Sequence, residues 1–565
     1  MSTDTRSFIK SDLALGFFLT LVSIKYTQVG FNPTDDGLII SQAHRILHGE
    51  LPHRDFLSPR PVGSPLIHSL ELLLPTPQLI TSRFIVIIQL VVIAVLLTRF
   101  ISTTLKTLDT LPIRILLITS IYVLNLHQFP LMPWHTIDGI LVVTLGISLF
   151  HRTKSHQFQF QSCAALLFGL APIIKQSFAP TILVGFVFII QSHDLSRRRK
   201  LTLVFLLTVP AFVYLSWIVS LGGGNAMLNQ LFGGPMPQTI SLWFGIHWIT
   251  WMLVACSLFL LLSRCVFAVK SAIQRFFSIA LGAAIGANAL YFALLGDLQL
   301  SNWSIPLVLT AVASLPLLYE VSQKDFRVYF SIIFLALMVC LSWGYPNPNL
   351  MSGALLFISL LPMLISIDRF LGRSRSAPRI ATSVFLNVLS LILAVFLLQV
   401  QHQARSTVAY RDLALNLQTQ SLSDIGNDFV GIRSNPRMYQ ILSDVGDCVK
   451  KYPSQNLALL PDGSSIPMLW GKRNPFKVDW WTPSELVYVP SPYINEIFER
   501  SSNLILFQTV PMSSVAGVEP IARANINSQI FSYGDDSMQR IFDGIPGEIV
   551  YCGSLVGKFT DKTEP

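Results

Sequence analysis

The stretch SRFIVIIQLVVIAVLLTRFISTT, residues 82–104, decides the fold class of this chain. Apolar residues fill it almost without interruption between Arg83 and Arg99. An α-helix rises about 1.5 Å per residue, so a run of this length spans a hydrocarbon core of about 30 Å. Inside lipid, a helix satisfies all backbone polar groups of such a segment internally. The stretch therefore predicts a transmembrane helix.

Similar apolar runs of about 16 to 22 residues recur along the chain, and we identify thirteen of them. Their approximate bounds are 8–29, 82–104, 112–130, 137–150, 159–175, 177–192, 201–221, 242–263, 276–296, 303–319, 327–344, 350–367 and 380–400. The composition agrees, because 52% of the 565 residues are hydrophobic and only 13% are charged. Six cysteines are too few for a disulfide scaffold, and the low charge excludes a disordered chain. The sequence predicts a polytopic α-helical membrane protein.

The first apolar run has an alternative reading as a signal peptide, because its most apolar part, residues 13–24, has the length of a signal-peptide core. No small-residue cleavage site follows it. We therefore expect it to be retained as the first transmembrane helix.

Lys and Arg residues gather in alternate connections, whereas segments 128–136, 222–241, 297–302 and 345–349 contain none. The basic connections hold Arg99, Lys106, Arg114, Arg152, Lys154, Arg197, Arg198, Arg199, Lys200, Arg264, Lys270, Arg275, Lys324, Arg327, Arg369, Arg373, Arg375 and Arg379. Short cytoplasmic loops carry such an excess of positive charge. We expect a multi-pass protein of the cytoplasmic (inner) membrane with a cytoplasmic amino terminus. An odd number of spans then places the carboxy-terminal part outside the cytoplasm.

The net charge of +9 does not indicate nucleic acid as a partner. The basic residues form small clusters between apolar runs, whereas nucleic-acid binding needs one continuous basic face or arm. The sequence instead indicates the lipid bilayer as the surroundings of residues 1–400.

Residues 401–565 differ in composition from the rest, with 17 acidic and 14 basic residues mixed with short β-like runs. We expect strands over 456–460, 503–507 and 548–551 and helices over 407–418 and 434–451. The pattern predicts a soluble extracytoplasmic α/β domain. Its two cysteines, Cys448 and Cys552, are expected to form a disulfide in an oxidising compartment.

The first outer loop, residues 30–81, is too long and too patterned for a simple connector. Thr34 is suited to cap a helix whose first turn holds Asp35 and Asp36. Apolar residues then recur at helical spacing up to Gly49, which predicts an amphipathic helix along the membrane surface. The acidic pair has two readings at this point, as a cap alone or as a functional site.

The same loop resembles that of the polyprenyl-phosphate-sugar-dependent GT-C glycosyltransferases, in the bacterial branch related to protein O-mannosyltransferases and the lipid A aminoarabinose transferase. Asp35 and Asp36 match the acidic pair of that family. Asp55 supports the motif, because with Phe56 it matches the following turn, and Arg60 takes the basic place before a proline. His53 departs from the tyrosine of many members.

This resemblance implies a GT-C fold of about thirteen spans, residues 1–400, with an outer carboxy-terminal domain. It also implies transfer of a sugar from a polyprenyl-phosphate-linked donor to a glycan, lipid or protein acceptor outside the cytoplasm. Such a transfer needs a group that takes a proton from the acceptor, and a carboxylate is suited to this task. Asp35 is the candidate base, and Asp36 its partner in orientation or metal binding.

The departing phosphate gains negative charge, so fixed cations at the outer side are candidates to bind it. Arg60, Arg83 and Lys175 are the candidates, although Arg83 is also placed to anchor its helix at the membrane interface. Asp138 and His135 form a candidate second-loop acid or acceptor site, and Asp138 has an equal reading as a helix-start carboxylate. A divalent cation, Mg²⁺ or Mn²⁺, held by Asp36 and Asp138 is left open.

Two other classes of function compete with this one. A transporter or flippase would also have many spans, but inverted repeats and midplane charges are not evident in the sequence. A polysaccharide polymerase of envelope glycan assembly would carry a large loop between later spans, and the longest such loop here has about 20 residues. The sugar, the acceptor and the anomeric outcome are not encoded in any pattern that we recognise.

Overall fold

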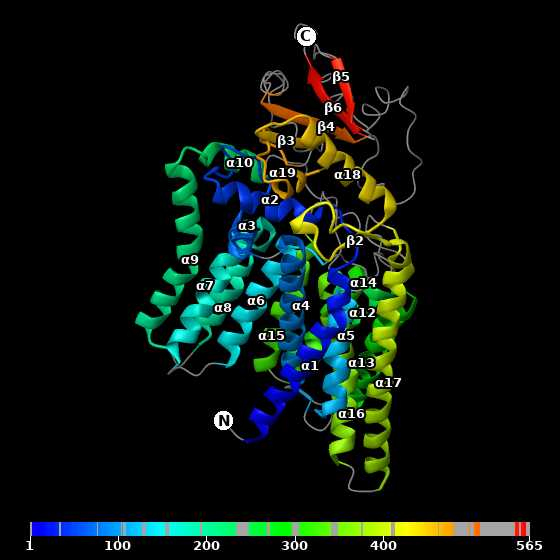
Figure 1. Ribbon diagram of the computed structural model, residues 1–565. Coiled ribbons are helices and arrows are strands. Elements are labelled where there is room, and N and C mark those ends of the chain that lie inside the picture. Colours follow the sequence, from blue (N-terminus) through cyan, green and yellow to red (C-terminus); the bar gives the residue numbers. More distant parts are fainter. Residues whose placement is uncertain are drawn as a thin grey trace.

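The computed structural model of the chain describes residues 3–32, 35–75, 77–102, 104–105, 109–126, 131–152, 157–192, 195–232, 248–267, 272–295, 304–321, 323–340, 349–373, 377–407, 413–460, 463–479, 497, 502–508, 548–552 and 555–560. Helices dominate these residues and form a bundle, and a small sheet lies beyond one end of it (Figure 1). The described part of the chain fits a polytopic helical membrane protein.

Every predicted apolar run coincides with a helix within the described residues. The helices are α1 (Thr3–Thr27), α4 (Gln78–Ser102), α5 (Leu111–Leu126), α6 (His135–Arg152), α7 (Phe158–Ile174), α8 (Thr181–Ile190), α9 (Arg197–Ser220), α12 (Trp248–Phe267), α13 (Ala272–Leu295), α14 (Ser304–Val321), α15 (Gln323–Cys340), α16 (Ser352–Arg373) and α17 (Ala377–Thr407). Among the described segments, Gln78–Ser102, Arg197–Ser220 and Ser383–Gln403 are long and apolar enough to cross a membrane, and further apolar helices have 10–17 residues.

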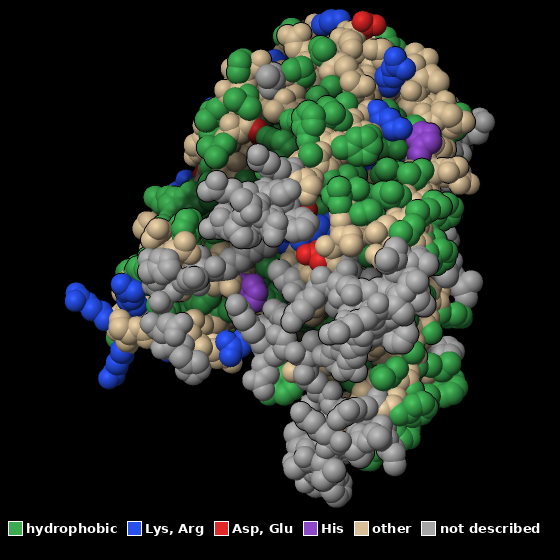
Figure 2. Space-filling model, turned by 90° about the horizontal axis from the view of Figure 1, so that it is seen from below, with side chains coloured by type: hydrophobic (Ala, Val, Ile, Leu, Met, Phe, Trp, Pro, Cys, Tyr) green, Lys and Arg blue, Asp and Glu red, His purple; other side chains and the backbone are tan. Residues whose placement is uncertain are grey.

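The outer faces of the bundle are apolar. On α9 the side chains of Phe205 and Phe212 are 66% and 71% exposed, and on α17 Val395 is 67% exposed. Contiguous apolar surface of this kind is not tolerated in water, but it matches the interior of a bilayer. Figure 2, which looks at the end of the bundle away from the sheet, shows Lys and Arg side chains around the edge of that end.

Helix α4 lies at the centre of the part of the bundle that carries the predicted site. It contacts α1, α5 and α6, and 72% of its most apolar window is buried. Two polar residues of α4, Arg83 and Gln89, are buried along with its apolar ones. Since buried polar groups need hydrogen-bond partners, the elements that pack against α4 at these two residues must supply polar groups.

The first outer loop folds between the bundle and the sheet (Figure 1). It contains α2 (Asp35–Leu47), α3 (Gly63–His68) and a short 3-10 turn, η1 (Glu71–Leu73). Helix α10 (Gly224–Phe232) follows α9 and lies on the same side. Thr34, predicted to cap α2, lies outside the described residues.

The carboxy-terminal part has an α/β structure in its described residues. Its elements are η4 (Leu415–Leu417), β1 (Gln420–Ser421), η5 (Asn427–Phe429), β2 (Arg433–Ser434), α18 (Pro436–Lys451), β3 (Asn456–Leu460), α19 (Ile466–Leu469), β4 (Asn503–Gln508), β5 (Glu548–Cys552) and β6 (Leu555–Thr560). The main sheet has the order β3-β4-β6-β5, in which β3 and β4 are parallel and the other pairs antiparallel.

The three predicted strands are confirmed as β3, β4 and β5, and the predicted helix over 434–451 is confirmed as α18. The predicted helix over 407–418 is wrong over residues 413–418, where only the single turn η4 forms; residues 408–412 lie outside the described residues. The disulfide between Cys448 and Cys552 is confirmed, with a Cα–Cα distance of 5.6 Å, and it joins α18 to β5.

The first loop and the carboxy-terminal part share one hydrophobic core. Phe31 of the loop packs edge-on against Phe429 with ring centroids 5.3 Å apart, and Leu79 at the start of α4 belongs to the same cluster. Backbone hydrogen bonds join Gly30 to Arg433 at 2.8 Å and Arg433 to Gln28 at 2.7 Å. Residues 429–433 therefore connect the start of the first loop to the carboxy-terminal part.

Candidate active site

The acidic pair forms the first turn of α2. The side-chain oxygen of Asn32 accepts the amide N–H of Asp35 at 3.3 Å, and its backbone carbonyl accepts that of Asp36 at 3.0 Å, so Asn32 supports the start of the helix. Both carboxylates are buried. The positive end of the helix dipole favours negative charge at this place. The pair is therefore not a solvent-exposed cap, and its role as a functional site stays a prediction.

Arg83 holds Asp36 in place. Its guanidinium forms an ion pair with the Asp36 carboxylate and donates to the backbone carbonyls of Thr27 and Gly30, both at 2.7 Å. These contacts join the end of α1, the start of α2 and the start of α4. Arg83 therefore has internal partners, and its role at the donor phosphate stays a prediction.

Helix α2 does not expose its polar face, in contrast to the expected amphipathic helix along the membrane surface. The Ser41 hydroxyl donates to the backbone carbonyl of Ser464 at 2.6 Å. At Gly37, a Cβ would lie 1.9 Å from the Cβ of Ser465, so only glycine fits. The correction has a physical cause, because the segment of residues 463–479 covers the polar face that the pattern assigned to water.

A group of basic side chains surrounds His135 at the start of α6. The guanidinium carbon of Arg60 lies 5.8 Å from the ring centroid of Trp134, and the Lys175 ammonium donates to the Thr136 hydroxyl at 3.2 Å. Arg60 and Lys175 both lie close enough to act on His135 electrostatically. The structure thus brings together three of the predicted site residues from the first loop, α6 and the end of α7.

His135 itself is buried, and neither of its ring nitrogens has a hydrogen-bond partner among the described residues. A buried polar group without a partner costs free energy unless something supplies the missing hydrogen bond. Beside two cations, an anion or a hydroxyl is the group that would supply it. This neighbourhood is therefore suited to bind a ligand that carries negative charge.

Asp138, the predicted second-loop acid, is committed to partners inside the chain. Its carboxylate accepts hydrogen bonds from Ser64, from Gln89 at 2.7 Å and from His68 at 3.3 Å. The other ring nitrogen of His68 meets Glu71 at 3.1 Å. We call these five residues the Asp138 cluster. These contacts tie α3 to α4 and α6, and both the helix-start reading and the acceptor-site reading of Asp138 stay predictions.

The Asp138 cluster alters the charge of His68. Burial alone would lower the pKa of the imidazole, but the carboxylates of Asp138 and Glu71 outweigh burial and raise the pKa to about 10. The imidazole is therefore charged at neutral pH. Our sequence reasoning missed His68, Ser64 and Gln89, although a polar Gln89 inside the apolar run 82–104 is a signal for a buried hydrogen bond.

Asp55 stabilises the turn that follows α2. Its carboxylate accepts the backbone N–H of Leu51 at 2.8 Å and pairs with the exposed Arg54 at 2.8 Å. The hydrogen bond from Arg54 lowers the pKa of Asp55. Within the turn, His53 adopts a φ of 66° and its ring meets Tyr214 and Gln230 at 2.9 Å each. His53 thus holds the loop against α9 and α10, whereas the contacts of Asp55 stabilise the turn itself.

The candidate metal ligands do not fit a metal centre. Asp36 is engaged by Arg83 and Asp138 by three side-chain donors, so both carboxylates already have their hydrogen bonds. No group of three or more His, Cys, Asp or Glu suited to a metal occurs in the described part of the chain. Arg83 and Gln89 stand six residues apart on α4, a rise of about 9 Å, so the two acids contact separate levels of that helix.

No protein-family model matches the chain, and no curated protein matches it. Among solved structures, the oligosaccharyltransferase AglB from Archaeoglobus fulgidus, in complex with an inhibitory peptide and a dolichol-phosphate, is similar with a TM-score of 0.41 and 9% identity over 100% of this chain and 75% of that chain. ArnT from Cupriavidus metallidurans, bound to undecaprenyl phosphate, is similar with a TM-score of 0.40 and 9% identity over 99% of both chains.

These structural neighbours belong to the GT-C superfamily of polyprenyl-phosphate-dependent glycosyltransferases, the superfamily that the first loop resembles. TM-scores of 0.41 and 0.40 by themselves assign neither fold nor activity to this chain. The functional assignment depends on the residues around α2 and His135.

Proposed function

We propose that the protein is a membrane glycosyltransferase that moves a sugar from a polyprenyl-phosphate donor to an acceptor hydroxyl of an envelope glycan, lipid or protein. One observation carries the proposal: buried His135, with no hydrogen-bond partner among the described residues, lies beside Arg60 and Lys175. A lipid-linked phosphate supplies acceptor oxygens for the ring of His135 and negative charge that the cations Arg60 and Lys175 attract. The buried acids of α2 supply a candidate base in the same outer region.

The transfer breaks the bond between the anomeric carbon and the phosphate oxygen and forms a bond from that carbon to the acceptor oxygen. Positive charge develops on the sugar ring in the transition state. The acceptor hydroxyl gives its proton to Asp35, and the electron pair of the broken bond leaves with the phosphate. Arg60 and Lys175 stabilise the charge that the phosphate gains, which is effective where water is excluded.

Asp36 and Arg83 position this base in the proposal. Arg83 fixes Asp36 through an ion pair and anchors it to the end of α1 through two carbonyls. Because Asp35 precedes Asp36 in the same helical turn, holding that turn in place also fixes the backbone position from which the Asp35 side chain extends. No step of the proposed reaction uses a metal ion.

The proposed arrangement in the membrane has thirteen spans within residues 1–400, the amino terminus in the cytoplasm, and residues 401–565 as an outer domain. The exposed Arg197, Arg198 and Arg199 at the start of α9 support this orientation. The disulfide of Cys448 and Cys552 also supports it, since disulfides persist in oxidising compartments.

Reporter fusions test the orientation. A fusion after residue 199 is expected to report the cytoplasm, and a fusion after residue 450 the outside. An outside signal at 199 would contradict the proposed orientation, because the basic run there is its firmest anchor.

Sugar transfer is tested with the full-length chain in lipid nanodiscs. The donor is undecaprenyl phosphate carrying a radiolabelled sugar, the acceptor is a membrane-envelope fraction, and released undecaprenyl phosphate is measured with the transferred label. Arg60→Gln is expected to slow transfer at least about 10-fold, because a charge-assisted contact to the leaving phosphate is lost. Arg54→Gln, in the same loop but exposed, serves as the matched control.

Equal rates for the two variants would contradict the role of Arg60. A wild-type chain that transfers no sugar from any such donor, but moves label across a sealed vesicle membrane, would replace the transferase proposal with a transporter.

A further inference from the structure

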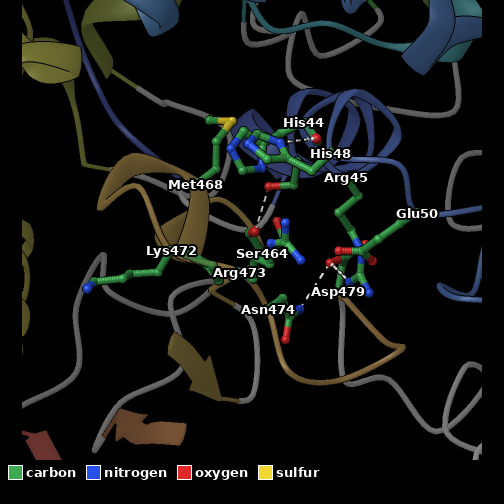
Figure 3. Close-up of a pocket in the computed structure, with 12 residues that line it drawn as sticks. His44, Arg45, His48, Glu50, Ser464, Met468, Lys472, Arg473, Asn474 and Asp479 are labelled. Atoms are coloured by element: carbon green, nitrogen blue, oxygen red, sulfur yellow. Dashed lines mark hydrogen bonds and ion pairs between the residues drawn. The ribbon is translucent and has the colours of Figure 1, made fainter. Parts of the chain in front are cut away.

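A second polar pocket lies between α2 and the segment of residues 463–479, on the face of α2 away from the bundle (Figure 3). His44 and His48 line it from α2, and Arg473, Asn474 and Asp479 line it from the segment. Figure 3 shows Arg45, Glu50 and Asp479 gathered at one end, with Arg473 opposite the two histidines. None of these residues takes part in the proposed transfer step.

The acidic end of the pocket has an unused acceptor. Asp479 is 5% exposed, and one of its carboxylate oxygens accepts from Arg45 at 2.7 Å and from Asn474 at 3.0 Å. Its other oxygen is buried and has no hydrogen-bond partner among the described residues. A buried carboxylate oxygen without a donor is costly, so this atom indicates a ligand that brings an N–H or O–H group.

The opposite end of the pocket is basic. Arg45 is balanced by Asp479 and Glu50, at 2.7 Å each. Arg473 is exposed, and no acid among the described residues pairs with it. Burial first, and then the charges of His48, Arg45 and Arg473, lower the pKa of His44 to about 4, so the ring is neutral and Arg473 is the cation at this end. This end is suited to an anionic group.

We propose that this pocket binds an acidic saccharide, a sugar that carries a carboxylate or a phosphate group, as the part of the acceptor away from the reacting hydroxyl. A sugar hydroxyl donates to the unused oxygen of Asp479, and the anionic group pairs with Arg473. His44 stands eight residues beyond Asp36 on α2, a rise of about 12 Å, so the bound part lies well away from the candidate base. The assignment as an acceptor subsite rests on the proposed transferase function.

The test is a binding titration of the full-length chain in nanodiscs, without donor. The probes are a galacturonic acid trimer, mannose 6-phosphate, inorganic phosphate and neutral maltotriose. At least one of the two acidic saccharides is expected to bind saturably, and at least about 10-fold more tightly than maltotriose or inorganic phosphate. Whether the carboxylate or the phosphate sugar binds better identifies the anionic group.

Arg473→Gln is the main variant, because this exposed side chain is not needed for folding, and it is expected to weaken binding about 10-fold. Asp479→Asn is a second variant, which removes the charged acceptor. Lys477→Gln is the matched control, an exposed cation of the same segment that does not line the pocket. Equal affinity of wild type and Arg473→Gln, no saturable binding of either acidic saccharide, or equal binding of inorganic phosphate would overturn the proposal.

The same titration on Asp35→Asn separates this proposal from the transferase function. Acidic saccharide is expected to bind this variant as it binds wild type, although sugar transfer is lost. Transfer without binding at the pocket would overturn the subsite alone, and binding without any transfer by wild type would overturn the transferase function while leaving a saccharide-binding pocket.

Discussion

Two buried acids, Asp36 and Asp138, differ in the side chains that hold them. They are 5% and 1% exposed, and each contacts a polar residue of α4. Among the described residues, the Asp36 carboxylate pairs with one cation, Arg83, whereas Asp138 has three donors from two elements. The comparison shows that α4 holds both acids, because Arg83 contacts the acidic turn of α2 and Gln89 contacts the start of α6. Loss of a single partner is therefore expected to destabilise the protein more at Asp36 than at Asp138.

The largest effect is expected for Arg83→Met. This change removes the single cation of Asp36 and leaves a buried carboxylate without compensation, which typically costs 3–5 kcal/mol, a value we take as about 4 kcal/mol here. The measurement is detergent or thermal unfolding of the full-length chain, followed by the fluorescence of its tryptophans. An Arg83→Met variant as stable as wild type would mean that Asp36 has another partner and that α4 does not hold the acidic turn of α2 in place.

A pH-dependent effect is expected for His68→Gln in the Asp138 cluster, and over any single pH unit it is smaller than that of Arg83→Met. The pKa of His68 is raised from 6.5 to about 10 in the folded protein, so its contribution to stability is complete below about 6.5 and is lost as the pH rises toward 10. Wild type should lose up to about 1.4 kcal/mol of stability per pH unit in this window relative to the variant. Stability is measured at intervals between the two pH values.

Parallel stability curves for wild type and His68→Gln would contradict a charged imidazole between Asp138 and Glu71. Ser64 and Gln89 still donate to Asp138 in this variant, so folding at neutral pH is expected to survive.

The smallest effect is expected for the exposed pair of Arg54 and Asp55. The Arg54 side chain is 51% exposed, and solvent screens such pairs to roughly 0–1 kcal/mol. Arg54→Gln should therefore change the unfolding midpoint little, and salt should reduce even that change. A loss of stability as large as that of Arg83→Met would show that burial does not determine how much each ion pair contributes to stability.

The sequence predicted those features that local pattern determines. Apolar runs marked the helices of the bundle, β3 has the predicted bounds of 456–460, and the acids at 35 and 36 begin a helix as expected. Each of these depends on residues near one another in the chain, where periodicity and helix-end preferences act. Residues 401–565 contain no other cysteine, so Cys552 was the one candidate partner for Cys448 there, and the structure shows that the two are bonded.

The partners of the site residues were not predictable in the same way. Asp138 bonds to Gln89 across 49 residues, and Ser41 bonds to Ser464 across 423 residues. Arg83 looked like either a phosphate ligand or an interfacial anchor, because sequence does not say which acid or carbonyl comes near it. Tertiary packing decides such contacts, and it also covers the face of α2 that helical periodicity assigned to solvent.

The central claim is that the acidic turn of α2 performs sugar transfer, and Asp35→Asn tests it most directly. Asparagine keeps the shape of the side chain and caps a helix about as well as aspartate, but it removes the basic oxygen. At saturating undecaprenyl-phosphate-sugar, the transfer rate is predicted to fall at least about 10²-fold, while donor affinity and unfolding midpoint stay close to wild type. Transfer at the wild-type rate by folded, donor-binding Asp35→Asn protein would contradict the claim.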